Sequence, residues 1–260
     1  MDPFSRHIAA CNNAVLPGGR LRFCIGAMQV GWVLPDLARA LGDFAGVTVA
    51  ADAVTLAEDA AGTFSEISRA LADAGWFRWR DEAFDVRARA GGPVLARVDR
   101  GALPKFGVLS EGAHVNGLVR RDGLLFVWVA RRAADKALDP GKFDHIVAGG
   151  VPAGMTPWQT LIKEAAEEAA IPPELAGQAV KVAEIGYAME RPEGLRRDLL
   201  HCYDLVLPED FVPRPADGEV EAFYLWPIER VAETVRRTDD FKFNVNLVLI
   251  DLFRRTERIS

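Results

Sequence analysis

Residues 149–171 read Gly-Gly-Val-Pro-Ala-Gly-Met-Thr-Pro-Trp-Gln-Thr-Leu-Ile-Lys-Glu-Ala-Ala-Glu-Glu-Ala-Ala-Ile. A glycine-rich loop runs here into a predicted helix with three glutamates. Glu164, Glu167 and Glu168 stand at i, i+3 and i+4, so they share one face of the helix and repel one another. A divalent cation would offset that repulsion. Mg²⁺ or Mn²⁺ is expected, because Mg²⁺ takes few protein carboxylates and completes its shell with water and phosphate.

The ends of this helix are also written in the sequence. Thr156, Pro157 and Gln159 predict a capping box with proline at the first helical position, and the prolines at 172 and 173 predict its end. Small apolar residues on the opposite face predict close packing on a sheet, with the carboxylates pointing away from the core. The alternative is a solvated amphipathic helix. The glycine loop and the capped start favour metal binding.

The segment resembles the Nudix box, a glycine, five residues, Glu, seven residues and then Arg-Glu-apolar-x-Glu-Glu-x-Gly-apolar. Lys163 stands where arginine is usual, and Ala170 replaces the late glycine. Met155 takes the position of the first glutamate when the count starts at Gly149. A thioether cannot do the work of a carboxylate, so the role of that first acidic position is open here. The three helical carboxylates are intact.

Length and composition narrow the class of protein. The chain has 260 residues, 50% hydrophobic and 26% charged, which predicts a soluble protein with two lobes. Its net charge of −6 argues against broad nucleic-acid binding. Cys11, Cys24 and Cys202 form neither a disulfide framework nor a C-x-x-C pair. No signal peptide and no 18-residue apolar stretch occur, so we expect a cytoplasmic protein without a membrane span.

The chain divides into an N-terminal α+β domain at 1–104 and a second domain at 105–260. In the first, strands are expected at 21–34 and 47–54, and helices at 2–14, 35–44 and 64–74. In the second, a hairpin at 113–119 and 124–130 precedes the box, strands follow at 182–189, 199–207 and 220–226, and helices at 228–237 and 241–254. The loop between the strands at 182–189 and 199–207 is expected to hold Gly194, Arg196 and Arg197. Helices on both faces of a mixed sheet give an α/β/α sandwich, which the Nudix resemblance also implies.

A narrower resemblance covers most of the chain from Leu21 onward. Ala113-His114-Val115-Asn116-Gly117, Asp139-Pro140-Gly141-Lys142-Phe143-Asp144 and Asp217-Gly218-Glu219-Val220-Glu221 are similar to segments of the thiamine-diphosphate-related Nudix proteins. Members of that branch carry an N-terminal domain of undefined function, and Phe23-Cys24-Ile25-Gly26 with Val30-Gly31-Trp32-Val33 resembles its signature. An apolar residue at Met155 and a lysine at Lys163 are usual in that branch.

The resemblance implies metal-dependent hydrolysis of a diphosphate linkage. In this branch the small-molecule substrate would be thiamine diphosphate or an oxidised or damaged form, cleaved to the monophosphate and phosphate. Glu164, Glu167 and Glu168 are the expected metal ligands, with the carbonyl group of Gly149 completing the sphere. Glu164 and Glu168 are also expected to be catalytic, together with Glu221 as general base or extra ligand. Exposed strand carboxylates are the alternative for Glu219 and Glu221.

Basic residues near the box are expected to bind phosphate oxygens. The candidates are Arg131, Arg132, Lys136, Lys142 and Lys163, for which plain surface charge is the alternative, and Lys163 has the further role of orienting a box glutamate. His114 is expected to be a hydrogen-bonded core residue. Aromatic residues that would stack on a ring are more often core; they are Trp32, Trp79, Phe143 and Tyr187.

Other functions stay open from the sequence. The same chemistry would serve nucleoside diphosphate derivatives such as ADP-ribose, and a non-catalytic diphosphate sensor is a further reading. Isopentenyl diphosphate isomerases share the fold but need a catalytic cysteine, and Cys202 is the sole cysteine in the second domain. A homodimer is an expectation from the fold, in which dimers are common.

Overall fold

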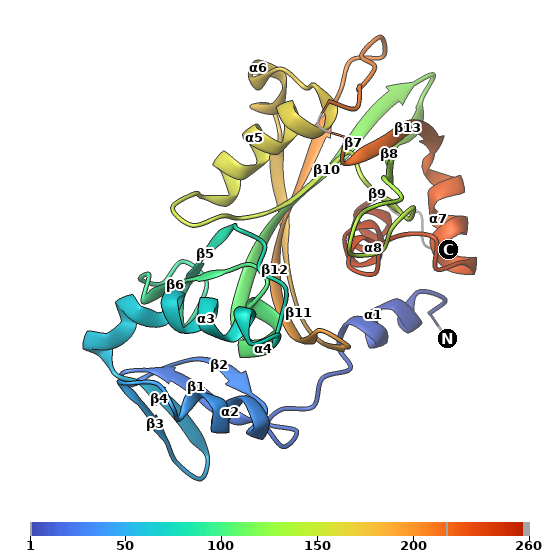
Figure 1. The fold of residues 1–260 in the computed structure, drawn as a ribbon. Helices are drawn as coiled ribbons and strands as arrows, with labels where there is room; N and C mark the ends of the chain where they lie inside the picture. The colour runs from blue at the N-terminus through green and yellow to red at the C-terminus, as the bar shows by residue number, and fades with distance from the viewer. Residues whose placement is uncertain (1, 217, 257–260) are drawn as a thin grey trace.

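The computed structural model of the chain describes residues 2–216 and 218–256, and Asp217 of the third quoted segment lies outside them. Within this part, the N-terminal domain has a four-stranded sheet in the order β2-β1-β4-β3 and a separate hairpin, β5–β6 (Figure 1). Its strands are β1 Leu21–Ile25, β2 Met28–Val33, β3 Val47–Val49, β4 Ala53–Leu56, β5 Ala83–Val86 and β6 Ala96–Asp99. Its helices are α2 Pro35–Leu41, the 3₁₀ helix η1 Glu58–Thr63, α3 Phe64–Asp73 and α4 Leu103–Phe106.

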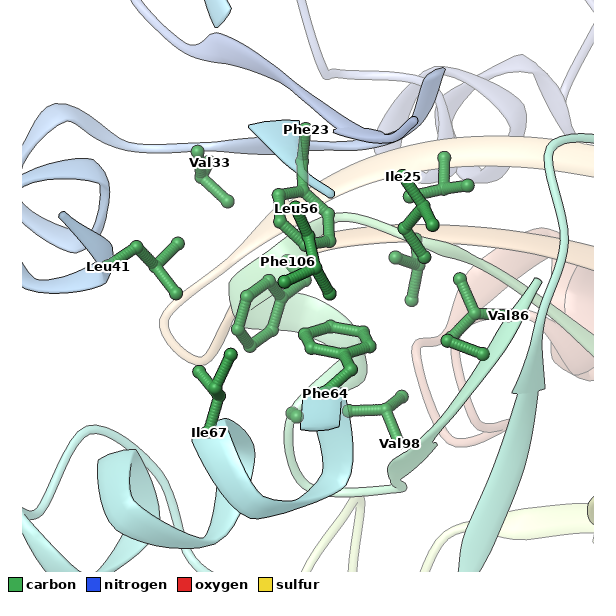
Figure 2. Packing of buried hydrophobic residues seen from close by; sticks show 14 of the residues in the cluster. Phe23, Ile25, Val33, Leu41, Leu56, Phe64, Ile67, Val86, Val98 and Phe106 are labelled. Carbon is green, nitrogen blue, oxygen red and sulfur yellow. The ribbon is translucent and has the colours of Figure 1, made fainter. Parts of the chain in front are cut away.

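Three buried phenylalanines hold this domain together. Phe23 on β1, Phe64 on α3 and Phe106 on α4 have ring centroids 4.8–5.2 Å apart, within the range of favourable aromatic pairs. Figure 2 shows these rings packed in one cluster with Val86 of β5 and Val98 of β6. The hairpin is therefore part of the same core as the sheet.

The second domain is built on a mixed sheet. Its described strands run in the order β11-β12-β7-β8-β13, with β10 paired to β7 and β9 paired to β8. Strands β7 and β12 are parallel, whereas β7 and β8 form the predicted antiparallel hairpin. The strands are β7 Leu109–Arg121, β8 Leu124–Arg132, β9 Phe143–His145, β10 Val147–Gly150, β11 Val180–Arg191, β12 Gly194–Val206 and β13 Val220–Pro227.

Helices cover both faces of this sheet, which confirms the predicted sandwich. On one face lie α5 Pro157–Ala169 and α6 Pro173–Ala176, which share a buried cluster with β7, β10 and β12. On the other face lie α7 Ile228–Arg237 and α8 Val245–Arg255. Figure 1 shows the two groups of helices on opposite sides of the strands. Burial runs almost without a break along the central strands β7 and β8 because both faces of the sheet are covered.

Helix α1 (Ser5–Cys11) packs on the second domain, although the sequence assigned this segment to the first. Phe4, at the start of α1, is fully buried and its ring centroid lies 5.7 Å from that of Phe253 on α8. Cys11 is buried among residues of β11, β12 and α8. The chain thus begins in the second domain with α1, continues through the whole first domain, and then forms the rest of the second domain (Figure 1).

The structure places the ends of several strands at other residues than the sequence predicted. The strand expected at 47–54 is two strands, β3 and β4, that pair antiparallel with each other. Arg196 and Arg197 lie within β12, because the turn is formed by Pro192 and Glu193 instead. Helix α4 runs across the boundary expected at 104/105, and the second sheet begins at Leu109.

Two further expectations concern the cysteines and the membrane. Cys11, Cys24 and Cys202 are all buried and free, as the sequence predicted. Among the described helices, none has the length and apolar character that crossing a bilayer requires.

Candidate functional site

Helix α5 begins and ends where local chemistry requires. The side chain of Thr156 accepts a hydrogen bond from the Gln159 backbone N–H (3.2 Å), and Gln159 Oε1 accepts one from the Thr156 N–H (2.9 Å). The predicted capping box is thus confirmed. The helix ends at Ala170, which adopts a left-handed conformation with φ of +53°. That is the position at which the resemblance led us to expect glycine.

Glu168 points into the protein and not away from it, contrary to the prediction for the carboxylate face. It is 7% exposed, and its Oε2 accepts a hydrogen bond of 2.9 Å from the backbone N–H of Ala148 on β10. Burial raises the pKa of Glu168 well above its ordinary value, and the hydrogen bond from Ala148 only partly opposes this. Among the described residues, no lysine or arginine forms an ion pair with Glu168 within 4.0 Å. Lys242, which is paired with Asp144, is a cation within electrostatic range of Glu168.

Glu164 lies against the glycine-rich loop. A Cβ atom placed on Gly149 would lie 2.6 Å from both Cγ and Cδ of Glu164, so glycine is needed for this approach. The side chain is 16% exposed, and Lys163 Nζ lies 3.1 Å from its Oε1. Burial raises the pKa of Glu164, and the contact with Lys163 works against that shift.

Glu167 is set apart from the other two glutamates. Its side chain is half exposed and accepts a hydrogen bond of 2.6 Å from Lys163 Nζ. That bond is the main cause of the raised pKa of Lys163. Of the three predicted ligands, Glu164 and Glu168 therefore face β10 together, whereas Glu167 faces solvent beside Lys163.

Glu219 is a third carboxylate within electrostatic range of Glu164 and Glu168, because its charge raises the pKa of both. In the described part of the chain, the oxygens of these three glutamates do not all lie within 4.8 Å of one another. Glu221 instead lies next to Arg131 (3.4 Å) with its side chain 59% exposed. A β-bulge lies between Val220 and Ala222, at Glu221 itself. We call Glu164, Glu168 and Glu219 the carboxylate cluster.

The predicted phosphate-binding residues are spread over different partners. Lys136 forms an ion pair with Glu219, and Arg132 Nη1 lies 2.8 Å from Asp144 Oδ2. Arg131 is paired with Glu221, as described above. The backbone carbonyl of Lys142 accepts a hydrogen bond from the Arg132 N–H (3.0 Å), which places Lys142 beside the end of β8. Lys136 and Lys163 are thus the predicted cations that directly contact the carboxylate cluster, at Glu219 and Glu164.

A buried polar network that the sequence did not reveal lies beneath the cluster. Asp144 Oδ2 contacts both Arg132 (2.8 Å) and Lys242 Nζ (3.3 Å), and its Oδ1 accepts the backbone N–H of His145 (2.9 Å). Burial alone would raise the pKa of Asp144, but Lys242 and Arg132 together hold it below its ordinary value. His114 Nδ1 lies 3.1 Å from His145 Nδ1, so His114 is a hydrogen-bonded core residue as predicted.

His114, Asp144 and His145 lie close enough together to hold a metal ion, but their surroundings oppose one. Both oxygens of Asp144 are already engaged by hydrogen-bond donors. Arg132 and Lys242 bring two positive charges against a single carboxylate, which disfavours a dication. The carboxylate cluster fits Mg²⁺ or Mn²⁺ better, because it offers oxygen ligands and Glu168 has no ion pair within 4.0 Å among the described residues.

Two hollows lie at the start of α5. One, of about 380 Å³, is lined by Glu111, Trp158, Glu184, His201 and Tyr203, among others. A second, of about 170 Å³, lies between the loop before α5 and the β5–β6 hairpin. Neither is lined by a member of the carboxylate cluster.

Comparisons with known proteins match these two domains separately. Residues 111–246 match the family model described as NUDIX domain, and residues 3–110 match one described as Domain of unknown function (DUF4743). The chain is 41% identical over 199 residues to Nudix hydrolase 20, chloroplastic, of Arabidopsis thaliana, which covers 76% of this chain and 53% of that protein. It is 44% identical over 176 residues to Nudix hydrolase 24, chloroplastic, of the same plant, which covers 67% and 48%. The chain spans about half the length of these curated relatives.

A solved structure agrees on the fold. The crystal structure of DR0079 from Deinococcus radiodurans superposes with a TM-score of 0.50 at 19% identity, over 67% of this chain and 98% of that one. At that identity the likeness concerns the fold alone.

Proposed function

The chain belongs to the Nudix family, and on that premise we propose that it is a metal-dependent hydrolase of a diphosphate linkage. The substrate we propose is thiamine diphosphate or one of its oxidised or damaged analogues, cleaved to the monophosphate and phosphate. The narrower resemblance in the sequence supports this choice, because it extends over both domains. ADP-ribose and other nucleoside diphosphate derivatives are the alternative substrates.

One observation carries the proposal of a metal-dependent reaction. Glu168 is buried with a raised pKa, and two more carboxylates, Glu164 and Glu219, raise it further. Acidic groups that raise one another's pKa are costly unless protons or cations neutralise them. A divalent ion neutralises them and brings a diphosphate with it.

The proposed roles follow from the geometry. Glu164, Glu168 and Glu219 would hold Mg²⁺ or Mn²⁺, which supplies charge for the phosphate oxygens and a more acidic bound water. Gly149 lets Glu164 approach β10 closely. Lys136 holds Glu219 in place. Glu164, whose pKa is raised by burial, is our candidate to accept the proton of the attacking water.

The overall reaction balances with one water molecule. Its oxygen bonds to one phosphorus, the bridging P–O bond breaks, and the leaving monophosphate takes the bridge oxygen. The released proton passes to Glu164 and then to solvent. Because phosphoryl transfer depends mainly on positioning and charge, few protein groups need to react. Glu167 and Glu221 are left with smaller roles.

A catalytic cysteine is disfavoured in this chain. Cys202 is fully buried, and burial raises its pKa to about 12, so a reactive thiolate is not available near neutral pH. This speaks against the isomerase reading. Cytoplasmic location and a homodimeric state stay predictions.

The proposed function is tested with a substrate panel and Mg²⁺ or Mn²⁺, with the cleavage products separated by chromatography. This readout is needed because ADP-ribose would give two monophosphate esters and no free phosphate. The panel holds thiamine diphosphate, its oxo and oxy analogues, ADP-ribose and nucleoside triphosphates. We expect metal-dependent cleavage that is fastest for the thiamine compounds and is lost in Glu168→Gln. Preference for ADP-ribose would overturn the substrate, whereas binding of a diphosphate without any cleavage would favour the sensor.

A further inference from the structure

The second glycine of the loop, Gly150, lies directly against a side chain of the N-terminal domain. A Cβ atom on Gly150 would lie 2.8 Å from Cζ and 3.2 Å from Cε1 of Phe84 on β5. The Phe84 ring is 3% exposed within the core of its own domain, so it cannot swing aside without disturbing that core. Gly149 meets Glu164 and Gly150 meets Phe84, so the Gly149-Gly150 pair lies between a catalytic carboxylate and the other domain.

We call the contact of the Gly149-Gly150 loop with Phe84 the seat of the loop. Two further hydrogen bonds from the loop backbone extend this seat toward helix α5. The N–H of Ala153 donates to the carbonyl of Ala83 (2.8 Å), and the N–H of Gly154 donates to Asp85 Oδ2 (3.1 Å). Asp85 is itself held by Arg97, whose Nε lies 3.1 Å from Asp85 Oδ1. The loop between β10 and α5 is therefore fixed by strand β5, and Figure 1 shows β5 beside it.

The hairpin that provides this seat is rigidly anchored. Val86 and Val98 are buried in the cluster of Figure 2. At the end of β6, the buried carboxylate of Asp99 accepts backbone N–H groups of Arg80 (3.0 Å), Glu82 (3.2 Å) and Gly101 (2.8 Å). A carboxylate that satisfies three N–H groups holds the adjoining backbone in one conformation. The residue next to it is Arg100.

Arg100 lies beside the Gly149-Gly150 loop, on the ring of Phe84. Its Cζ lies 5.9 Å from the centre of that ring, which itself touches Gly150. Its guanidinium lies 2.7 Å from Glu82, and the side chain is half exposed. Arg100 is thus a cation of the N-terminal domain placed next to the loop that Glu164 approaches from the other side.

We propose that the N-terminal domain completes the diphosphate site, with Arg100 binding a phosphate oxygen of the substrate and Phe84 positioning the Gly149-Gly150 loop. This inference rests on the proposed function. Arginine suits the task because its planar guanidinium offers several N–H donors to phosphate oxygens at once. The bound diphosphate would replace Glu82 as the partner of Arg100.

The contact between Gly150 and Phe84 is tested by enlarging the first residue and reducing the second, singly and together. Gly150 has no positive φ, so alanine is disfavoured there only by the contact with Phe84. We expect Gly150→Ala to lower kcat roughly 100-fold by shifting the loop, as small misplacements do, and Phe84→Leu to lower it far less. The double variant should recover activity to near the Phe84→Leu level. If it is as inactive as Gly150→Ala, Phe84 does not position the loop.

Arg100 is tested by binding as well as by turnover. We expect Arg100→Ala to raise KM about tenfold with little change in kcat, which corresponds to one lost charged hydrogen bond, and Arg100→Lys to recover part of it. Arg39→Ala, an exposed arginine on α2 paired with Asp36, is the matched control and should behave as wild type. Unchanged KM in Arg100→Ala, with wild-type turnover present, would exclude Arg100 as a phosphate ligand and leave the proposed function intact.

A binding measurement separates the two proposals further. Calorimetry with methylenediphosphonate and Mn²⁺ requires no hydrolysis. If the wild type binds this probe and Arg100→Ala binds it about tenfold more weakly, Arg100 contacts phosphate even when no substrate is turned over. If the wild type neither binds the probe nor releases phosphate, both proposals fail together. Equal binding of Mn²⁺ alone to both proteins is expected, because Arg100 is not a metal ligand.

Discussion

The backbone N–H of Ala148 donates to the buried carboxylate of Glu168 at 2.9 Å, and this bond joins helix α5 to strand β10. It is the one hydrogen bond that lowers the pKa of Glu168 against the effect of burial. The backbone therefore holds the carboxylate in place, and its remaining oxygen lone pairs can coordinate a cation.

Removing the charge of Glu168 should abolish catalysis, whereas removing that of Glu167 should not. We expect Glu168→Gln to lower kcat by at least about 100-fold, since even outer partners of a metal site cost 10–100-fold. Glu167→Gln, a matched change on the same helix, removes an exposed ion pair with Lys163 and should cost about threefold or less. Phosphate release and Mn²⁺ calorimetry measure both. Equal losses in the two variants would refute the division of roles.

The raised pKa of Glu168 should make the stability of the metal-free protein fall as pH rises, whereas the affinity for Mn²⁺ should rise. The folded protein holds the Glu168 proton more tightly than the unfolded chain, whose pKa is near the ordinary 4.5. Stability of the metal-free protein from this group is therefore full below that value and is lost as pH rises through the raised pKa. Mn²⁺ competes with the proton, so its affinity should rise over the same range. Thermal unfolding with and without Mn²⁺ tests this, and Glu168→Gln should remove the dependence.

Gly149 should be intolerant of even one methyl group. In Gly149→Ala the added Cβ would meet Glu164 at 2.6 Å, and displacement of that carboxylate should lower kcat roughly 100-fold. Gly186→Ala on β11 is the control, because its Cβ would meet Leu199 at an ordinary 4.0 Å. Steady-state kinetics of both variants decide the matter. A fully active Gly149→Ala would show that Glu164 need not approach β10.

Ala170 offers a stabilising substitution. Its φ of +53° is unfavourable for a residue with a Cβ, so Ala170→Gly should raise the free energy of unfolding by about 0.5–1 kcal/mol. Ala166→Gly, at an exposed position inside the same helix, should lower it by about 1 kcal/mol. Urea unfolding of both variants gives the sign directly. Destabilisation by both changes would mean that Ala170 is not strained.

Asp144 should be essential to stability. Asp144→Asn leaves Lys242 buried and Arg132 nearly so, both without their carboxylate, and should cost about 3–5 kcal/mol. Because the folded pKa of Asp144 is lowered from 3.8, its contribution is present above that value and is lost as pH falls through the folded pKa. Asp36→Asn, in an exposed pair with Arg39, should change stability by no more than about 0.5 kcal/mol. Urea unfolding at several pH values compares them.

Helix caps and tight turns could be predicted from the sequence, because they depend on a few neighbouring residues. Thr156 and Gln159 fixed the start of α5, and the turn at 122–123 fixed the β7–β8 hairpin, because both depend on neighbouring residues. Glu164 and Glu168 were identified by their spacing. Their direction toward β10 was not, since it depends on where the helix lies on the sheet.

Features that depend on distant parts of the chain escaped prediction. Glu219 lies against Lys136 just before β13, whereas Glu221 lies on β13 against Arg131, and a bulge at 220–222 stands between them. These partners depend on how β13 pairs with β8, which the local sequence does not specify. Strands β5 and β6 were missed because they are short and their partners are set by the packing of Phe84 and its neighbours. Lys242 and Asp144 are 98 residues apart, so no spacing could have joined them.

The docking site of α1 delays its folding during translation. Helix α1 is translated well before the elements that it packs against, β11 and α8, and α8 is completed only at Arg255. A seven-residue helix is not stable alone in water, and at bacterial or eukaryotic elongation rates the delay lasts on the order of ten seconds or more. The nascent segment must therefore wait unfolded, with Phe4 exposed, until translation has delivered the surface that shelters it.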